Sequence, residues 1–332
     1  MAANDDRSER VARSRVRGLS SPVLVGPGLV GLAMLVLSGC SQPERPESTA
    51  LAETDAQHWE RTALAWRERR LARLTEPYGW LSLVGLHFLD DGEWRVGSGA
   101  GSDLEVPAGP ADWGVLTVIG ERAWFDPAPG VTIRVDGEPV QAPASVAFFP
   151  EGHPDARRIE AASVELQLLD RSGQLVLRVR DSEAPTRIGF AGLDYFPFAP
   201  QWRIEADWRA HPEGRSLLIA NVLGELVHEP NPGSVEFEIN GRRFGLEAID
   251  SDDDLFFVFA DRTSGRESYG LGRFLYADWP VDGKVVLDFN RAYNPPCSFT
   301  EFSTCPLPPP ENRLDIRIEA GELAPSVPIS GP

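Results

Sequence analysis

The chain has 332 residues, of which 32 are lysine or arginine and 50 are aspartate or glutamate, giving a formal net charge of −18 at pH 7. Such a charge argues against proteins that bind nucleic acid or anionic membrane surfaces through a basic face. With 42% apolar residues, the chain can bury one large core or two moderate ones.

The first 39 residues are predicted to be a lipoprotein signal peptide. Five arginines between Arg7 and Arg17 precede an apolar run from Pro22 to Leu37, which ends in Leu37-Ser38-Gly39-Cys40. This tetrapeptide resembles the lipobox of bacterial lipoproteins, in which the cysteine is lipidated and becomes the first mature residue. A transmembrane anchor is the alternative, but the run is about 16 residues long and a spanning helix needs ~20.

Lipidation of Cys40 predicts a chain that is held at the membrane by its lipid and lies in the cell envelope. Ser41 follows the cysteine, where many inner-membrane lipoproteins of Gram-negative bacteria have aspartate. The expected location is therefore the outer membrane, facing the periplasm, if the host has two membranes. Residues 40–54 are polar and are expected to form a flexible tether.

An amphipathic helix is predicted over residues 55–74. Apolar and long side chains recur there at three- and four-residue spacing, which is the period of one helix face. They are Trp59, Ala63, Trp66, Arg70 and Leu74. Thr54 or Asp55 is suited to the N-cap, and Pro77 and Gly79 are expected to end the helix.

Short alternating strands follow and, with the helix, make up a first β unit over residues 55–182. Asp136-Gly137, Asn240-Gly241 and similar pairs supply tight turns along the chain. The run from Trp94 to Pro107 has a weak likeness to forkhead-associated β-sandwiches. The element that binds phosphothreonine in that fold has no counterpart between Pro107 and Val118, so the likeness implies architecture alone.

A second β unit is expected over residues 183–325, after the Asp181-Ser182-Glu183-Ala184-Pro185 boundary. It includes a strand-like run at 217–224, two central strands around a Thr-Ser-Gly turn at 263–265, and an edge strand at 314–322. Twenty-nine prolines and 31 glycines suit short strands and tight corners. The predicted fold is all-β, mainly antiparallel, with two packed β units of sandwich or barrel type and one N-terminal amphipathic helix.

Three long motifs resemble a bacterial and archaeal domain family of unknown function, many of whose members are lipoproteins. The motifs are PYGWLSLVGLHFLDDGEWRVGS at 77–98, VFADRTSGRESYGLGRFL at 258–275 and DFNRAYNPPCSFTEFSTCPLPPPENRL at 288–314. The resemblance extends from about Trp59 to Glu322. It implies an envelope protein, and no biochemical activity accompanies it.

Cys297 and Cys305 are predicted to form a disulfide, because the envelope is oxidising and Cys40 is assigned to lipidation. A zinc pair and a reactive thiol are the alternatives. Zinc needs four ligands at closer spacing, and no histidine follows His228. A nucleophilic thiol needs a neighbouring base, which only a distant part of the chain could supply.

Polar residues at the ends of apolar runs form the candidate ligand site, since strand ends and loops commonly carry function. Arginine and asparagine would suit a small polar or anionic ligand. The alternative is that the charged residues form internal ion pairs and the asparagines bond their own turns. The candidates are His87, Asp261, Tyr269, Arg273, Asp288, Asn290, Arg291 and Asn294, together with Arg262 and Asn312.

No known catalytic, metal or cofactor motif occurs in the sequence. The serines lack a G-x-S-x-G element, the histidines are scattered, and Gly97, Gly99 and Gly101 open no helix. We therefore expect no cofactor, no metal and no nucleic acid. The leading hypothesis is a lipid-anchored envelope protein that binds a small ligand or an envelope protein. The alternatives are an envelope hydrolase using the strand-end cluster and a scaffold module.

Overall fold

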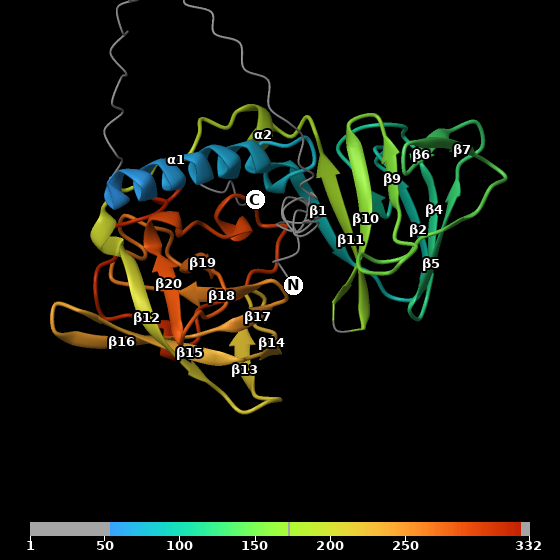
Figure 1. The fold of residues 1–332 in the computed structure, drawn as a ribbon. Helices are drawn as coiled ribbons and strands as arrows, with labels where there is room; N and C mark the ends of the chain where they lie inside the picture. Colours follow the sequence, from blue (N-terminus) through green and yellow to red (C-terminus); the bar gives the residue numbers. More distant parts are fainter. Residues whose placement is uncertain (1–53, 172, 327–332) are drawn as a thin grey trace, which may run out of the picture. The chain divides into compact units, whose positions relative to one another are not determined.

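The computed structural model describes residues 54–171 and 173–326 (Figure 1). The expected signal peptide, Cys40 and the tether up to Glu53 lie outside these residues. The expected helix is confirmed as α1 (Asp55–Leu74). The Thr54 hydroxyl accepts a hydrogen bond from the Gln57 amide at 3.3 Å, and the Gln57 side chain accepts one from the Thr54 amide at 3.0 Å. This reciprocal pair is a capping box, and it fixes where the helix begins.

Two sheets enclose the first hydrophobic core, which contains Val96, Trp113, Phe125, Ile159 and Leu177. The six-stranded sheet consists, in spatial order, of β1 (Leu83–Phe88), β11 (Gln174–Asp181), β10 (Val164–Arg171), β9 (Arg158–Ala161), β6 (Thr132–Val135) and β7 (Glu138–Gln141). The five-stranded sheet consists of β3 (Leu104–Glu105), β2 (Gly92–Gly97), β4 (Gly114–Ile119), β5 (Arg122–Pro127) and β8 (Val146–Ala147).

Two of the three further sheets enclose the second core, which contains Val235, Phe257, Phe259, Leu275 and Phe289. The third, a hairpin, contributes Leu217 and Ile219 to a separate cluster. The four-stranded sheet consists of β16 (Arg242–Glu247), β15 (Gly233–Ile239), β12 (Arg203–Ala210) and β20 (Lys284–Asp288). The three-stranded sheet consists of β17 (Ile249–Ser251), β18 (Asp254–Phe259) and β19 (Arg273–Ala277). A separate two-stranded hairpin consists of β13 (Ser216–Ala220) and β14 (Leu226–Pro230). Short helices are α2 (Pro185–Ile188), η2 (Trp80–Ser82), η3 (Pro200–Trp202), η4 (Phe289–Arg291), η5 (Pro296–Ser298) and η6 (Pro310–Asn312).

The predicted fold class is confirmed. Of the ladders between the described strands, only β2–β3 is parallel, and none of these sheets closes into a barrel. The Asx-Gly turns form as expected. Asp136 and Gly137 have φ angles of 51° and 88°, and Asn240 and Gly241 have 52° and 75°. Positive φ at both central positions is what a two-residue hairpin loop requires.

The proline-rich segment packs closely against Gly272, the residue before β19. Gly272 has a φ of 101°, and a Cβ there would lie 2.5 Å from Cγ of Pro308. The expected edge strand at 314–322 does not form; the segment makes isolated bridges and single hydrogen bonds. The reason is that the carbonyls of Ile318 and Ala320 accept hydrogen bonds from the Arg273 guanidinium instead of from a neighbouring strand.

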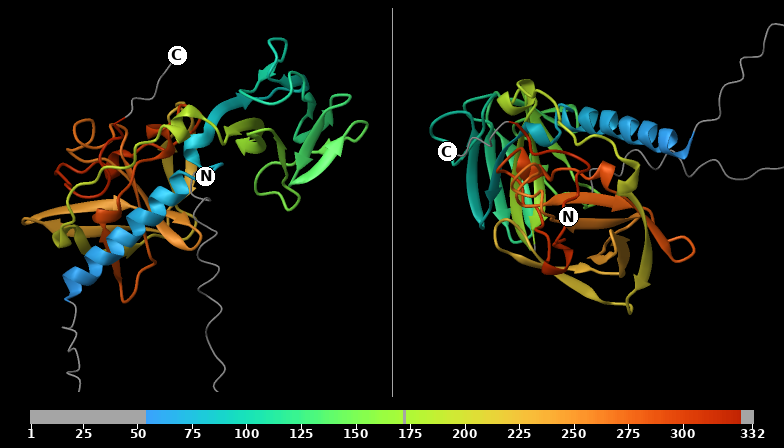
Figure 2. Two further views of the ribbon diagram at one scale, coloured as in Figure 1. Left: turned by 90° about the horizontal axis from the view of Figure 1, so that it is seen from above. Right: turned by 90° about the vertical axis from the view of Figure 1, so that its left-hand side faces the viewer.

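Helix α1 packs against the second group of sheets, as both views of Figure 2 show. Its inward residues include Ala63, Arg70 and Leu74, which are buried. The Arg70 side chain reaches Glu322, near the end of the described chain. The helix thus covers the C-terminal segment rather than extending away from the fold.

Candidate functional site

The predicted residues Asp261 and Arg273 form a fully buried ion pair. Arg273 Nη2 lies 3.2 Å from Asp261 Oδ1, and neither side chain has any exposed surface. Asp261 Oδ2 also accepts a hydrogen bond from the Ile318 amide at 2.6 Å, and Oδ1 accepts one from the Thr263 hydroxyl at 2.8 Å. Burial lowers the pKa of Arg273, and the charge of Asp261 opposes that shift. These contacts are those of an internal ion pair that holds the C-terminal segment in place.

Asn294 belongs to a second buried network, centred on Glu322. Arg70 Nε donates to Glu322 Oε1 at 3.0 Å, and the backbone N–H of Asn294 donates to Oε2 at 2.8 Å. The Arg70 guanidinium also lies 4.7 Å and 4.8 Å from the ring centroids of Trp80 and Tyr293. The carboxylate of Glu322 is thereby neutralised by a cation stacked between aromatic rings. Sequence reasoning missed both members of this pair, because they are separated by 252 positions in the chain.

The other asparagines bond backbone groups of distant loops. Asn290 is fully buried, accepts from the Ala199 amide and donates to the Ala199 carbonyl, each at 3.0 Å, and its Nδ2 also donates to Asp288. Asn312 accepts from the Glu247 amide at 2.7 Å and donates to two carbonyls. A buried amide that satisfies both its donor and its acceptor on backbone is typical of a structural role.

The remaining candidates lie at separate places. The Tyr269 hydroxyl donates to the Cys297 carbonyl at 2.9 Å, and burial raises its pKa. His87 lies on β1, opposite Leu177 of β11, and burial lowers its pKa, so the ring is neutral at pH 7. The Arg291 guanidinium lies 6.0 Å from the ring centroid of Trp66. Arg262 forms an exposed ion pair with Asp315. The structure joins Asp261 to Arg273 and Asp288 to Asn290, and places the others apart.

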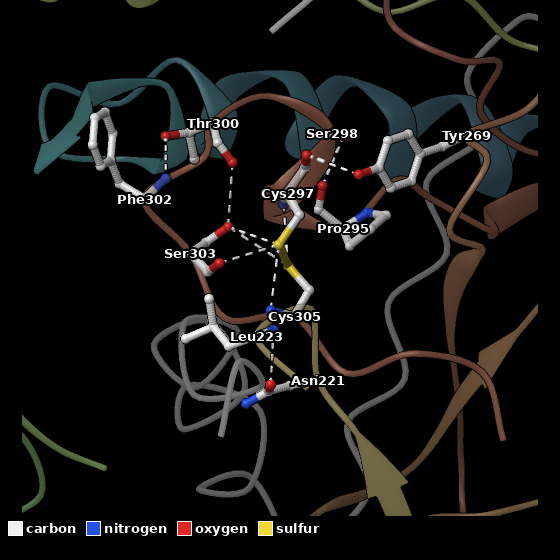
Figure 3. Close-up of a disulfide and its surroundings, with 10 residues drawn as sticks. All are labelled: Asn221, Leu223, Tyr269, Pro295, Cys297, Ser298, Thr300, Phe302, Ser303 and Cys305. Atoms are coloured by element: carbon white, nitrogen blue, oxygen red, sulfur yellow. Dashed lines mark hydrogen bonds between the residues drawn. A yellow bond between two sulfur atoms is a disulfide. The ribbon is translucent and has the colours of Figure 1, made fainter. Parts of the chain in front are cut away.

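Cys297 and Cys305 are joined by a disulfide, as predicted (Figure 3). Both are buried, in a cluster with Leu217, Ile219 and Phe274. The loop that the disulfide closes makes hydrogen bonds in two directions. Thr300 donates to the Leu83 carbonyl of β1, and the Cys305 carbonyl accepts from the Val222 amide at 3.0 Å.

The hairpin of β13 and β14 is pinned to that disulfide loop. The Leu307 amide donates to the Ala220 carbonyl at 2.7 Å, and Asn221 forms a bridge with Pro306. Asn221 also shapes the turn, since its Oδ1 accepts from the amides of Leu223 and Glu225 at 2.9 and 3.1 Å. Figure 3 shows Asn221 and Leu223 beside Cys305. These contacts attach the turn between β13 and β14 to the disulfide loop.

One side of this hairpin is apolar and exposed. Leu217 and Ile219 point inward, while Leu218, Leu223 and Leu226 keep 47%, 53% and 63% of their surface exposed. Leu218 pairs with His228 and Ala220 with Leu226, so Leu218 and Leu226 are diagonal neighbours on one face. Leu223 is exposed at the turn that joins the two strands. We call Leu218 and Leu226, together with Leu223 at the turn, the leucine face. Exposed apolar side chains gathered in this way commonly mark a binding surface.

Sequence reasoning identified a strand at 217–224 but missed its exposed face. The run LLIANVLGEL is almost continuously apolar, so its period does not show which leucines point outward. The signal that could have been used is the interruption at Asn221 and Gly224, which marks a hairpin turn. A hairpin of two short strands cannot bury both of its faces against one core.

No cluster of metal-binding side chains occurs among the residues that the structure describes. None of the described helices is long and apolar enough to cross a membrane.

Residues 188–323 match the model of a family described as "Protein of unknown function (DUF1684)". Among solved structures, the chain is similar to an uncharacterised protein of Haloarcula marismortui, determined by solution NMR. The two are 33% identical, the match covers 41% of this chain and 78% of that one, and the TM-score is 0.36. No curated protein matches.

Proposed function

We propose that this protein, whose residues 188–323 form a domain of the DUF1684 family of unknown function, is a lipid-anchored cell-envelope protein that binds a protein partner through the leucine face. The observation that carries the proposal is the presence of three exposed leucines on a hairpin that a disulfide loop holds in place. A rigid apolar surface binds without the entropic cost of ordering a loop.

A protein partner fits the site better than a small polar ligand does. Asp261 and Arg273 have no exposed side-chain surface, and Asn290 and Asn294 are fully buried. Asn290 Nδ2 donates to the Ala199 carbonyl, Asn294 Nδ2 donates to the Leu323 carbonyl, and Arg273 donates to Asp261 and to the carbonyls of Ile318 and Ala320. The same enclosure keeps these four residues out of the reach of a substrate, so the hydrolase alternative loses four of the residues on which it depended.

The chemistry of the partner follows from the rim of the leucine face. Glu225 is exposed at the turn, and the chain as a whole carries −18. Apolar contacts at the centre with charged groups at the rim are the usual arrangement of a transient interface. We infer an apolar surface flanked by lysine or arginine, since opposite charge at the rim speeds association and disfavours other partners.

The anchor is proposed from the sequence. Cys40 follows an apolar run that is too short to span a bilayer, and Ser41 directs the protein to the outer membrane in a two-membrane host. Thirteen residues, Ser41 to Glu53, separate the lipidated cysteine from the described chain. At ~3.4 Å per residue they could reach about 45 Å, which is enough to present the hairpin to another envelope protein.

The test is co-purification from detergent-solubilised envelopes. The double variant Leu218→Asp/Leu226→Asp places two charges on the leucine face, and Val281→Asp is the matched control because Val281 is 71% exposed elsewhere. The double variant should lose its co-purifying partner while Val281→Asp retains it. Exposed substitutions of this kind should leave the unfolding midpoint nearly unchanged. Retention of the same partner by the double variant would contradict the proposal.

A further inference from the structure

A histidine lies on the same face of the β13–β14 hairpin as two of the exposed leucines. His228 is directly opposite Leu218 in the register of the hairpin and two positions beyond Leu226 along β14. Because successive side chains of a strand point to opposite faces, His228 and Leu226 point to the same side. His228 is exposed. A partner that covers Leu218 and Leu226 therefore covers the imidazole ring as well.

The hydroxyl of Ser216 holds this ring on the face. Ser216 Oγ lies 3.0 Å from His228 Nδ1, and the two residues are diagonal neighbours across the hairpin. A hydroxyl can donate to an unprotonated ring nitrogen and can accept from a protonated one. The hydrogen bond is therefore compatible with both charge states, and the ring can gain a proton while it stays beside the leucines.

Other titratable and charged groups belong to the hairpin, to the loop before it and to β17, which packs against β14. They are His211, Arg215, Glu225, Glu229 and Asp250. His211 and Arg215 both contact Glu247, at 2.8 and 3.5 Å. Glu225 accepts from Asn221 Nδ2 at 2.7 Å, and Glu229 follows His228 along β14 and so points to the opposite face.

Histidine is the side chain that ordinarily changes its charge between about pH 5 and pH 8. Leu218 and Leu226 have no charge, so a change of pH in this range alters the charge of the leucine face through His228. A neutral imidazole can be covered by an apolar surface at little cost. An imidazolium must give up its hydration when it is covered, and this costs free energy unless the charge is paired.

We propose that partner binding at the leucine face weakens as pH falls, because His228 gains a proton. This inference rests on the proposed function, since it concerns the regulation of the same surface. The partner inferred above carries lysine or arginine at its rim, so it repels an imidazolium instead of pairing with it. Desolvation and charge repulsion therefore act in the same direction, and both disfavour the complex at low pH.

The amount of partner retained at two pH values tests this inference. Full-length protein in detergent is loaded with envelope extract at about pH 7.5 and washed at about pH 7.5 or about pH 5.5. The probe is the species that the wild type captures and Leu218→Asp/Leu226→Asp does not. His228→Gln removes the titrating group but keeps hydrogen-bonding atoms, and His228→Phe keeps an uncharged ring. His153→Gln is the matched control, because His153 is also exposed and lies between β8 and β9.

Wild type and His153→Gln should retain several-fold less of this species at the lower pH, whereas His228→Gln should retain equal amounts at both. Equal retention by the wild type, or an undiminished loss in His228→Gln and His228→Phe, would overturn the inference and leave the leucine face as a binding surface. If no leucine-dependent species is captured at the higher pH, the proposed function fails and the inference fails with it. If His228→Gln retains none at either pH, His228→Phe decides.

Discussion

Replacement of Arg273 by methionine tests whether the Asp261–Arg273 cluster is structural. The substitution keeps a long side chain but removes the cation from a pair in which both side chains are fully enclosed. Asp261 is left as a buried charge that still accepts from the Ile318 amide, and the carbonyls of Ile318 and Ala320 lose their donor.

Breaking one side of a buried ion pair costs about 3–5 kcal/mol, because the remaining charge is uncompensated. Domains of this kind have a total stability of roughly 5–15 kcal/mol, so Arg273→Met removes a large fraction of it. The double variant Asp261→Asn/Arg273→Met should be more stable than Arg273→Met alone, because it leaves no unpaired charge.

Urea unfolding followed by tryptophan fluorescence measures these free energies. Arg209→Met is the matched control, since Arg209 pairs with Glu236 at the surface with 63% and 52% exposure, and exposed pairs contribute little. A loss below about 1 kcal/mol for Arg273→Met would refute the reasoning. It would mean that the Asp261 carboxylate, once unpaired, is hydrated, and a group that water reaches is also accessible to a ligand.

Three further predictions concern the disulfide, His87 and the anchor. The double variant Cys297→Ala/Cys305→Ala should have a free energy of unfolding lower by about 2.5 kcal/mol, from loop entropy at a sequence separation of 8. Amides of the β13–β14 hairpin should also exchange faster with deuterium in this variant. Unchanged exchange would show that the disulfide does not hold the hairpin. Burial lowers the pKa of His87, so below about pH 6.5 the unfolded chain binds a proton that the folded chain resists. The free energy of unfolding should therefore fall as pH drops from about 7 to about 5. In urea titrations at several pH values, the free energy of unfolding of His87→Gln should fall less steeply over the same range. Identical pH dependence of the two proteins would exclude this contribution. Cys40→Ser should move the protein out of the membrane fraction, and continued tight membrane association would argue against lipidation.

The local features of the fold could be predicted from the sequence. The helix at 55–74 has a clear apolar period, and its cap uses residues three positions apart. The Asx-Gly turns at 136–137 and 240–241 depend on backbone angles that asparagine, aspartate and glycine favour. The Cys297–Cys305 bridge spans one short loop. Each depends on residues close together in the chain.

The candidate site could not be predicted in the same way, because its arrangement depends on distant contacts. The partner of Arg70 is Glu322, and the C-terminal segment is held by Arg273 through its carbonyls. No local pattern indicates either contact, so strand-end polar residues resemble a binding site in the sequence and are internal in the structure. The leucine face could not be predicted for a different reason. Strand β13 has apolar residues on both of its faces, so the sequence does not show which of them is exposed.

Site-specific photo-crosslinking in intact cells tests the central claim, that the leucine face binds a protein, most directly. A photoreactive residue replaces Leu223 in one strain and Val281 in another, two exposed positions in different parts of the fold. We predict a discrete crosslinked species from position 223 that disappears when Leu218→Asp/Leu226→Asp is added, and none from position 281. Absence of crosslinks at 223, or equal crosslinking at both positions, would contradict the account.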